Sequence, residues 1–383
     1  MNKKLLAAAI GVAIAAPAFA QSSNVTLYGR LNTSLENDTS SGSRSATVVR
    51  SNQSRLGVKG TEDLGSGLKG VFGIETQLAS DSGSGGLGNA LRNAYVGLGS
   101  TAAGTLAIGR LDVGAPGGAP AYSSYAAVWT DVNHDNGTTG LTQTDGLGTV
   151  NGSLPGNRAL FGIRTRTSNA ISYAAPQFFP GLQVHARYSL NGTDNNNLAS
   201  NTNTPANPYE QDVREFELAG LYKTGGLSLT GAYTDANIKD TSALFNIVNY
   251  RWQLGAGYDF GFVKLGGLFA RTNYDRVSAG SRDNASEAGV SLAAPFGPHQ
   301  LILNYAQRQL QGRESVAAAT QGRDRVWQLG YHYNLSARTR AYAFYQNRDA
   351  NTGSSVEAPA ASVSSPLVTA TVKTFGVGVR HNF

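Results

Sequence analysis

The amino-acid sequence predicts an all-β fold: a 16-stranded antiparallel transmembrane β-barrel with a long third loop folded into its lumen. Three observations support this prediction. The chain begins with an export signal, its segments alternate apolar and polar side chains from end to end, and short and long connections follow one another in rotation. Strands that alternate lipid-facing and water-facing residues are typical of outer-membrane barrels.

The N-terminus reads as a signal peptide. Two lysines precede a short apolar run, Leu5–Ala16, and Ala18–Ala20 fits the small-x-small rule for cleavage. The apolar run is too short to anchor the chain in a bilayer. No shift in composition marks a second domain, so we expect residues 1–20 to be removed and residues 21–383 to form the barrel as one unit.

The composition excludes several classes of protein. The chain has no cysteine, which rules out disulfides and thiolate metal sites. The mean hydropathy is −0.23, and no stretch after the signal peptide approaches the roughly 20 apolar residues that a transmembrane helix needs. The formal net charge of +6 is modest, and no Lys/Arg-rich patch suggests a nucleic-acid partner.

Alternating side chains predict the strands and their two faces. In Val25–Leu35 the odd positions are mostly apolar and the even positions are polar. The segments Leu68–Leu78, Arg251–Phe260 and Thr374–Phe383 alternate in the same way. Successive side chains of a strand point to opposite faces, so each segment would present one face to lipid and the other to water.

The connections between these segments predict the number of strands. About seven are short turns built mostly on Gly or Pro, and about eight are longer and rich in Asn, Ser, Thr, Gly and Asp. Fifteen connections join sixteen strands, a number at which barrels leave an aqueous channel. The short turns lie at 62–67, 100–104, 176–181, 223–226, 259–262, 294–298 and 335–338, and the longer segments at 37–48, 80–90, 111–160, 191–211, 235–248, 273–284, 310–323 and 348–370.

The third long connection, residues 111–160, is the candidate constriction loop. Structureless loops of more than ~15 residues are uncommon and are usually functional or disordered. The segment carries aromatic residues between positions 122 and 129 that need packing partners. It also carries four carboxylates, Asp112, Asp131, Asp135 and Asp145, of which the first three are the candidate constriction residues. We expect it to fold into the lumen with its carboxylates facing the pore. The alternative is a long exterior loop with an adhesive patch.

The wall opposite this loop is predicted to be basic. Alternation places Arg55 on the polar face, whereas Arg92 and Arg110 fall on the apolar parity, which implies a bulge or a position at a strand end. Taken alone, any one arginine could be a solvated wall residue tied to a neighbouring loop. Rings of arginine favour anions, and the cluster is the stronger signal. The candidate wall residues are Arg30, Arg55, Arg92, Arg110, Arg164 and Arg166.

No motif in the sequence indicates catalysis or cofactor binding. The five histidines are scattered without a metal-binding spacing, and no GxSxG motif occurs. Several aromatic residues fall on the lipid-facing parity, where they could form interfacial girdles or pack in a subunit contact. These aromatic residues are Tyr258, Phe260, Tyr305, Trp327, Tyr331, Tyr333, Phe375 and Phe383.

Several motifs carry a resemblance to a known family. They read SSNVTLYGRL near the mature N-terminus, SRLGVKGTEDLGSGLKGVFGIE at 54–75, RNAYVGL at 92–98, GTLAIGR at 104–110, SNAISYAAPQFFPGLQVHARYS at 168–189, and VGVRHNF at the C-terminus. Over almost the whole mature chain the sequence resembles the Gram-negative general porins of the beta-proteobacterial branch. The third loop departs from the family's acidic PEFGG motif, since it reads GAPGGAPAYSSY and has no glutamate.

The resemblance implies sixteen strands, a homotrimer in the cell outer membrane among lipid and lipopolysaccharide, and a third loop folded inward. It also implies that Arg55 and Arg92 belong to the constriction, with Arg164 or Arg166 as a third member. The terminal Phe383 would be read by the barrel-insertion machinery.

We therefore expect a water-filled channel for passive diffusion of small hydrophilic solutes and ions, weakly selective for anions, with no enzymatic activity. The alternative is a channel selective for small organic anions or oligosaccharides. A sugar channel would need a ladder of aromatic residues in the lumen, and the aromatic residues here lie mostly on the lipid-facing parity. A barrel enzyme and an adhesin with a plugged lumen are further alternatives.

Overall fold

A computed structural model describes the residues that form the strands and their tight turns. Within this part of the chain, no helix is long and apolar enough to cross a membrane. The signal peptide and residues 111–160, except for Leu111, lie outside the described residues. The described ranges are 23–40, 45–83, 91–111, 167–190, 211–240, 246–276, 281–311, 322–352 and 368–383.

The described residues form seventeen strand segments in one antiparallel sheet. The segments are β1 (Ser23–Ser40), β2 (Ala46–Ser51), β3 (Ser54–Gly65), β4 (Leu68–Leu78), β5 (Leu91–Ser100), β6 (Gly104–Leu111), β7 (Thr167–Ala174), β8 (Leu182–Ser189), β9 (Gln211–Thr224), β10 (Leu227–Asp240), β11 (Asn246–Asp259), β12 (Lys264–Arg276), β13 (Ser281–Phe296), β14 (His299–Gln311), β15 (Gly322–Asn334), β16 (Thr339–Thr352) and β17 (Val368–Asn382).

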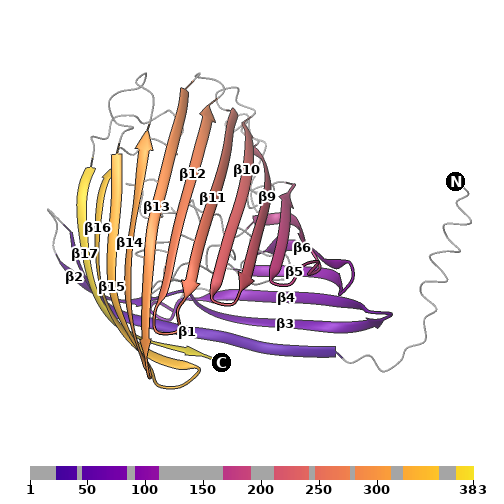
Figure 1. The fold of residues 1–383 in the computed structure, drawn as a ribbon, viewed down its shortest axis with the longest axis horizontal. Helices are drawn as coiled ribbons and strands as arrows, with labels where there is room; N and C mark the ends of the chain where they lie inside the picture. The colour runs from indigo at the N-terminus through magenta and orange to yellow at the C-terminus, as the bar shows by residue number, and fades with distance from the viewer. Residues whose placement is uncertain are drawn as a thin grey trace, which may run out of the picture.

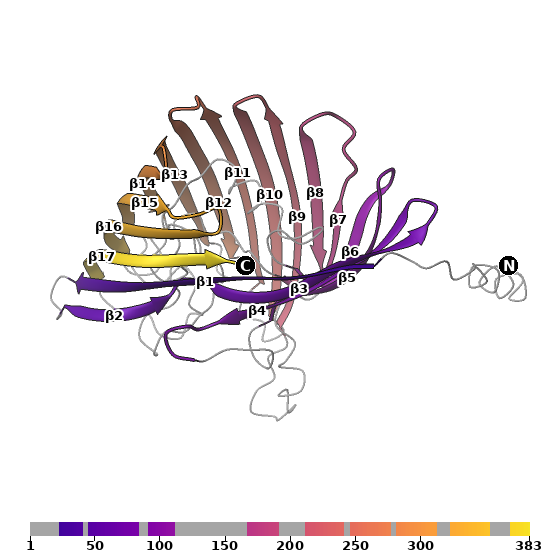
Figure 2. The same ribbon diagram turned by 90° about the horizontal axis from the view of Figure 1, so that it is seen from below.

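The sheet closes on itself. From β3 to β17 each strand pairs with its neighbours in sequence, and β1 joins the two ends by pairing with β17 on one side and with β2 and β3 on the other. Figure 2 shows β17 beside β1 at this seam. The seam continues to the last residue, because Gly29 N donates to Phe383 O at 3.0 Å and Phe383 N donates to Gly29 O at 3.1 Å. In Figure 1, β3 and β4 cross the direction of β13 and β14, as tilted strands on two walls of a barrel do.

The seventeen segments make sixteen barrel strands, which confirms the predicted number. Both β2 and β3 pair with β1, and the register passes from Thr33↔Ser51 to Arg30↔Arg55 with one extra residue on the β2–β3 side. This extra residue is a β-bulge at Asn52 and Gln53, and β2 and β3 are one strand interrupted by it. Gln53 has φ 55°.

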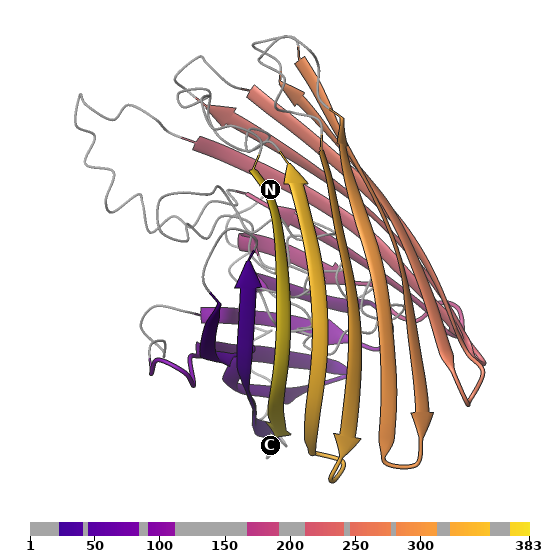
Figure 3. The same cartoon turned by 90° about the vertical axis from the view of Figure 1, so that its left-hand side faces the viewer.

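Seven tight turns join successive strands at one end of the barrel, at the places that the sequence predicts. The C-terminus lies at the same end, which is at the bottom of Figure 3. At the opposite end the strands run further than expected, so the predicted loops 37–48 and 235–248 were too long. Strand β1 reaches Ser40 and β10 reaches Asp240. Hydrogen bonds between polar side chains stabilise this extension of the strands. For example, Asn37 Nδ2 donates to Thr47 Oγ1 at 2.9 Å.

The two faces of the wall are the reverse of those of a water-soluble core. Large apolar side chains point outward and are exposed, for example Leu27 at 63% and Val96 at 58%. Polar side chains point inward and are buried, among them Asn32, Asn304 and Gln328. The eight aromatic residues that were predicted on the lipid-facing parity are all exposed on the outer face. The period-2 interpretation of the sequence is therefore confirmed.

Among the described residues, four aromatic side chains lie on the inner face and stand opposite glycines. Alternation in Val25–Leu35 places the first of them, Tyr28, on the polar face, whereas the sequence analysis did not assign the other three. Each stands opposite a glycine of the neighbouring strand, and its ring covers the space that a Cβ would take. A Cβ at Gly57 would lie 2.4 Å from Tyr28 Cζ, too close for any side chain. The four pairs are Tyr28 with Gly57, Tyr95 with Gly73, Tyr342 with Gly378 and Phe344 with Gly376.

Candidate functional site

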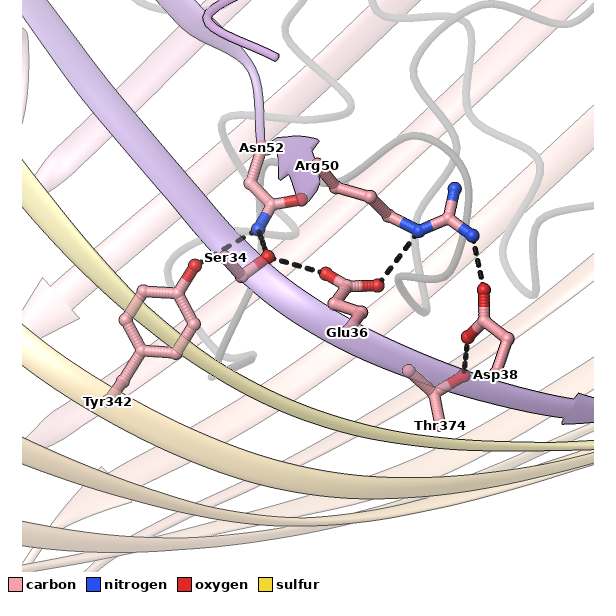
Figure 4. A network of polar contacts seen from close by, with 7 residues as sticks. All are labelled: Ser34, Glu36, Asp38, Arg50, Asn52, Tyr342 and Thr374. Carbon is pink, nitrogen blue, oxygen red and sulfur yellow. Dashed lines mark hydrogen bonds and ion pairs between the residues drawn. The ribbon is translucent and has the colours of Figure 1, made fainter. Parts of the chain in front are cut away.

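The bulge in β2–β3 is held from across the barrel seam. Asn52 Nδ2 donates to Ser34 Oγ at 2.7 Å on β1 and to Tyr342 OH at 3.0 Å on β16, as Figure 4 shows. The Tyr342 hydroxyl in turn donates to Asn32 Oδ1 at 2.8 Å. These bonds hold the bulge so that the next residue, Gln53, turns its side chain toward β5.

A second bulge brings Arg92 to the inner face. One extra residue lies on β5 where its pairing with β4 passes from Glu75 to Thr76. Arg92 has the parity of Val96, which points outward, yet only 3% of Arg92 is exposed. Its Nε donates to Glu75 Oε1 at 2.6 Å and its Nη1 donates to Gln53 Oε1 at 3.2 Å. Of the two explanations open at the sequence level, the bulge is therefore correct for Arg92.

A cavity of about 330 Å³ lies on the inner face beside these bulges. Arg30 and Arg55, direct partners across β1 and β3, both line it, and Lys59 lies 5.0 Å above the ring of Tyr28. The one carboxylate among its described lining residues is Glu75, whose Oε2 is 3.9 Å from Arg55 Nε. Three cationic side chains thus face a single acid in this Arg30–Arg55 cavity.

Arg187 on β8 is neutralised by the wall itself. Its Nη2 donates to Glu215 Oε1 at 2.8 Å and to Glu217 Oε2 at 2.9 Å, both on the neighbouring β9. All three side chains are 1% exposed. Because two carboxylates surround one guanidinium, this cluster does not add positive charge to the inner face.

Arg251 of β11 and Arg308 of β14 both form ion pairs with one carboxylate, that of Glu287 on β13. Arg251 Nη2 lies 2.6 Å from Glu287 Oε2, and Arg308 Nε lies 3.4 Å from Glu287 Oε1. Glu287 is 1% exposed, and Arg251 Nη1 also donates to Thr272 Oγ1 at 2.9 Å. These contacts connect β11 with β12 and β13, and β13 with β14.

At the long-loop end of β1 the charge is acidic. Arg50 Nε lies 3.0 Å from Glu36 Oε2, and the same guanidinium also pairs with Asp38, which accepts from Thr374 Oγ1 at 2.7 Å (Figure 4). Two carboxylates here face one arginine. From Asp38 back to Arg30 is about 26 Å along β1 at about 3.3 Å per residue, so the inner face beside β1 changes from acidic to basic toward the tight-turn end.

The structure brings together only part of the predicted site. Arg30 and Arg55 line the cavity, and Arg92 reaches it through Glu75. Arg110 does not line it: this residue is next to the end of β6, where Nε donates to Leu91 O at 2.8 Å and Nη1 to Ser168 Oγ at 2.6 Å. The remaining predicted residues, Arg164, Arg166, Asp112, Asp131 and Asp135, and the loop 111–160 from 112 on lie outside the described residues.

Sequence reasoning missed Glu75 as the acid of the site. It assigned Glu75 to the polar face but sought the acidic partners only in the third loop. The parity conflict at Arg92 was the available signal, since a bulge there faces the strand that carries Glu75. Among the described residues, no group of three or more histidine and acidic side chains could hold a metal ion.

The sequence can be compared with those of known proteins. A family model described as Gram-negative porin matches residues 6–353. Outer membrane porin protein 32 of Delftia acidovorans is 29% identical, with 92% of each chain covered. An outer membrane porin protein of Bordetella pertussis is 27% identical over the full length of both chains.

Solved structures share the architecture. An anion-selective porin from Comamonas acidovorans superposes with a TM-score of 0.67 at 22% identity, covering 94% of this chain and 100% of that one. The trimer form of OmpT, an outer membrane protein of Vibrio cholerae, superposes with a TM-score of 0.62 at 18% identity, with 94% and 100% covered.

Proposed function

The chain belongs to the Gram-negative porin family, and from this premise we propose that its lumen is a water-filled channel with a weak preference for anions, open to small hydrophilic solutes and ions. It is an outer-membrane β-barrel protein and not an enzyme. The mature barrel is proposed to comprise residues 21–383 after removal of residues 1–20.

The observation that carries this proposal is the reversal of the two faces. Exposed leucine and valine side chains cover the outside, where lipid would meet them, and hydrogen-bonded polar side chains cover the inside. A closed barrel leaves no free sheet edge in the bilayer. Water and polar solutes could therefore enter the lumen without meeting a continuous apolar surface.

The anion preference is supported by the charge of the Arg30–Arg55 cavity. Guanidinium groups stay charged at any physiological pH, and three cationic side chains there outnumber the single carboxylate. Arginine-rich constrictions favour anions. We propose that the constriction is formed by Arg30, Arg55, Arg92, Arg110, Arg164 and Arg166 on the wall and by Asp112, Asp131 and Asp135 of an inward-folded loop 111–160.

The assembly is proposed to be a homotrimer embedded in outer-membrane lipid and lipopolysaccharide, with Phe383 read by the insertion machinery. Phe383 also closes the barrel, because its ring occupies the space beside Gly29. For a trimer, the ion current through one inserted assembly should fall to zero in three equal steps, one for each barrel.

Reconstitution in liposomes tests the channel directly. We expect liposomes with the purified protein to swell in an iso-osmotic solution of a pentose or an amino acid but not in one of a large dextran, because the proposed channel admits small solutes only. Heat-denatured protein is the matched control. Liposomes that stay sealed to small solutes would show that the lumen is closed.

The alternative function is a channel selective for oligosaccharides or for small organic anions. The inner-face rings do not supply the exposed ladder that a sugar channel needs, because Tyr95, Tyr342 and Phe344 are buried against glycines of the adjacent strands. Saturable block of the ion current by maltodextrins would favour the oligosaccharide channel. Saturable block by small organic acids alone would favour a channel for organic anions instead.

A further inference from the structure

Two arginines at the tight-turn end of the barrel face each other with the same charge. Arg340 of β16 and Arg380 of β17 are direct cross-strand partners. Arg380 lies in phase with the buried Thr374 and out of phase with the exposed Val379, and Arg340 lies in phase with the buried Tyr342. Both side chains therefore belong to the inner face, and both residues are half-buried.

Within the part of the chain that the structure describes, no carboxylate balances this pair. Among the described residues, Arg340 and Arg380 form no ion pair with an aspartate or a glutamate. Arg340 Nη1 lies 3.2 Å from His332 Nδ1, and Arg380 Nε donates to Asn382 Oδ1 at 3.4 Å. Like charges directly opposite on a sheet are destabilising, and half-burial increases this cost. The pair contrasts with Arg187, which has two glutamates beside it.

A third arginine converges on the same place. Arg30 Nε donates to Asn382 Oδ1 at 3.1 Å, so this single amide oxygen accepts from both Arg30 and Arg380. Arg30, Arg380 and Arg340 lie on the three adjacent strands β1, β17 and β16. Three guanidinium groups are thus gathered on one patch of the inner wall, contiguous with the Arg30–Arg55 cavity but nearer the mouth that the tight turns surround.

We propose that Arg340 and Arg380, assisted by Arg30, form a binding station for a small oxyanion, a carboxylate or a phosphate, at the mouth of the lumen that the tight turns surround. The planar guanidinium fork matches two oxygens of such a group and is less suited to a spherical chloride ion. Two forks side by side on adjacent strands can each bond to oxygens of one such group. The proposal rests on the channel function, because solutes must reach the lumen.

The competing explanation is structural. In that case the two guanidinium groups serve only to hold the strand ends through Asn382 and His332, and a bound anion plays no part. The two explanations differ in their response to added oxyanion, which gives the experiment its design.

The test measures phosphate binding by titration calorimetry on the folded barrel in detergent at low salt, and chloride conductance of the same preparation in planar bilayers. Wild type should bind inorganic phosphate saturably, and phosphate should reduce its chloride current. Arg340→Gln/Arg380→Gln should weaken phosphate binding about tenfold or more, since two charge-assisted hydrogen-bond donors are lost. Arg340→Lys/Arg380→Lys, which keeps the charge and removes the forks, should weaken it less.

The matched control removes two positive charges from the outer face of the barrel. Arg271 of β12 and Arg325 of β15 are exposed and lie out of phase with the buried Thr272 and Val326, so Arg271→Gln/Arg325→Gln should bind phosphate as wild type does. The shift of the folded band on heating in SDS gels shows that each variant is a barrel.

The possible results separate the two proposals. If the glutamine pair binds phosphate as tightly as wild type, the station is wrong and the channel stands. If phosphate binding falls as expected but no variant conducts ions, the station stands and the channel proposal is wrong. The absence of saturable phosphate binding in wild type that conducts chloride would also overturn the station.

Discussion

Arg187→Ala is expected to lower the free energy of unfolding of the barrel by about 3–5 kcal/mol, the usual cost of removing one partner of a buried ion pair. Arg187 is in contact with Glu215 and Glu217, and all three side chains are 1% exposed. Without the guanidinium, two buried carboxylates would face each other with no cation. Urea-induced unfolding followed by tryptophan fluorescence measures the change.

Two controls accompany this prediction. The triple variant Arg187→Met/Glu215→Gln/Glu217→Gln removes all three charges and should recover most of the loss, since replacing a buried ionic cluster is often close to neutral. Lys264→Ala breaks the exposed pair with Asp259, 2.8 Å long, and should leave the unfolding curve unchanged. An Arg187→Ala barrel as stable as wild type would mean that water reaches the cluster and screens it.

Glu75→Gln is expected to raise the chloride-to-potassium permeability ratio about two- to fivefold at low salt. A unit charge about 4 Å from a permeating ion changes its energy by about 1 kcal/mol in water, and salt reduces this effect. Glu75 is the one carboxylate among the described lining residues of the Arg30–Arg55 cavity, so its loss leaves the cations unopposed. Reversal potentials in a KCl gradient across a planar bilayer give the ratio.

The opposite change should follow from removing cations. Arg55→Gln/Lys59→Gln should lower the ratio, and neutral residues at Arg164 and Arg166 together with Arg55 should lower it further if these form the constriction. Arg271→Gln, on the exposed outer face of β12, is the matched control. Unchanged reversal potentials in the Glu75 and Arg55 variants would place the selective section of the channel elsewhere.

Much of the fold could be predicted because its rule is local. A strand between lipid and water alternates every second residue, so Val25–Leu35 alone determines which face of β1 meets lipid. Tight turns are equally local, since Gly65 and Gly67 adopt positive φ angles that other residues avoid. The count of strands then follows from the rotation of short and long connections.

The bulges could not be located by a local rule. Whether an extra residue is tolerated at Asn52 depends on a hydrogen bond to Tyr342, which is far away in sequence and near only after the barrel closes. Arg92 was the exception, because a polar residue on an apolar parity implied that the phase had changed. Three aromatic rings of the inner face, Tyr95, Tyr342 and Phe344, were missed because a glycine on the adjacent strand makes room for each.

The Arg340–Arg380 pair required the register of β16 against β17, which neither segment determines by itself. Loop 348–370 between these strands is long, so its length does not fix which residues stand opposite each other. Each arginine lies on the polar face of its own strand. Only the pairing of β16 with β17 shows that the two charges stand directly opposite each other.

The most direct test of the central claim, that this barrel encloses a water-filled lumen whose wall is biased toward positive charge, is the reversal potential of the unmodified protein in a KCl gradient. The account predicts an ohmic current whose reversal potential is shifted from zero toward the chloride equilibrium potential, and this shift becomes smaller as the salt concentration rises. A membrane that stays insulating, or a reversal potential shifted toward the potassium equilibrium potential, would contradict it.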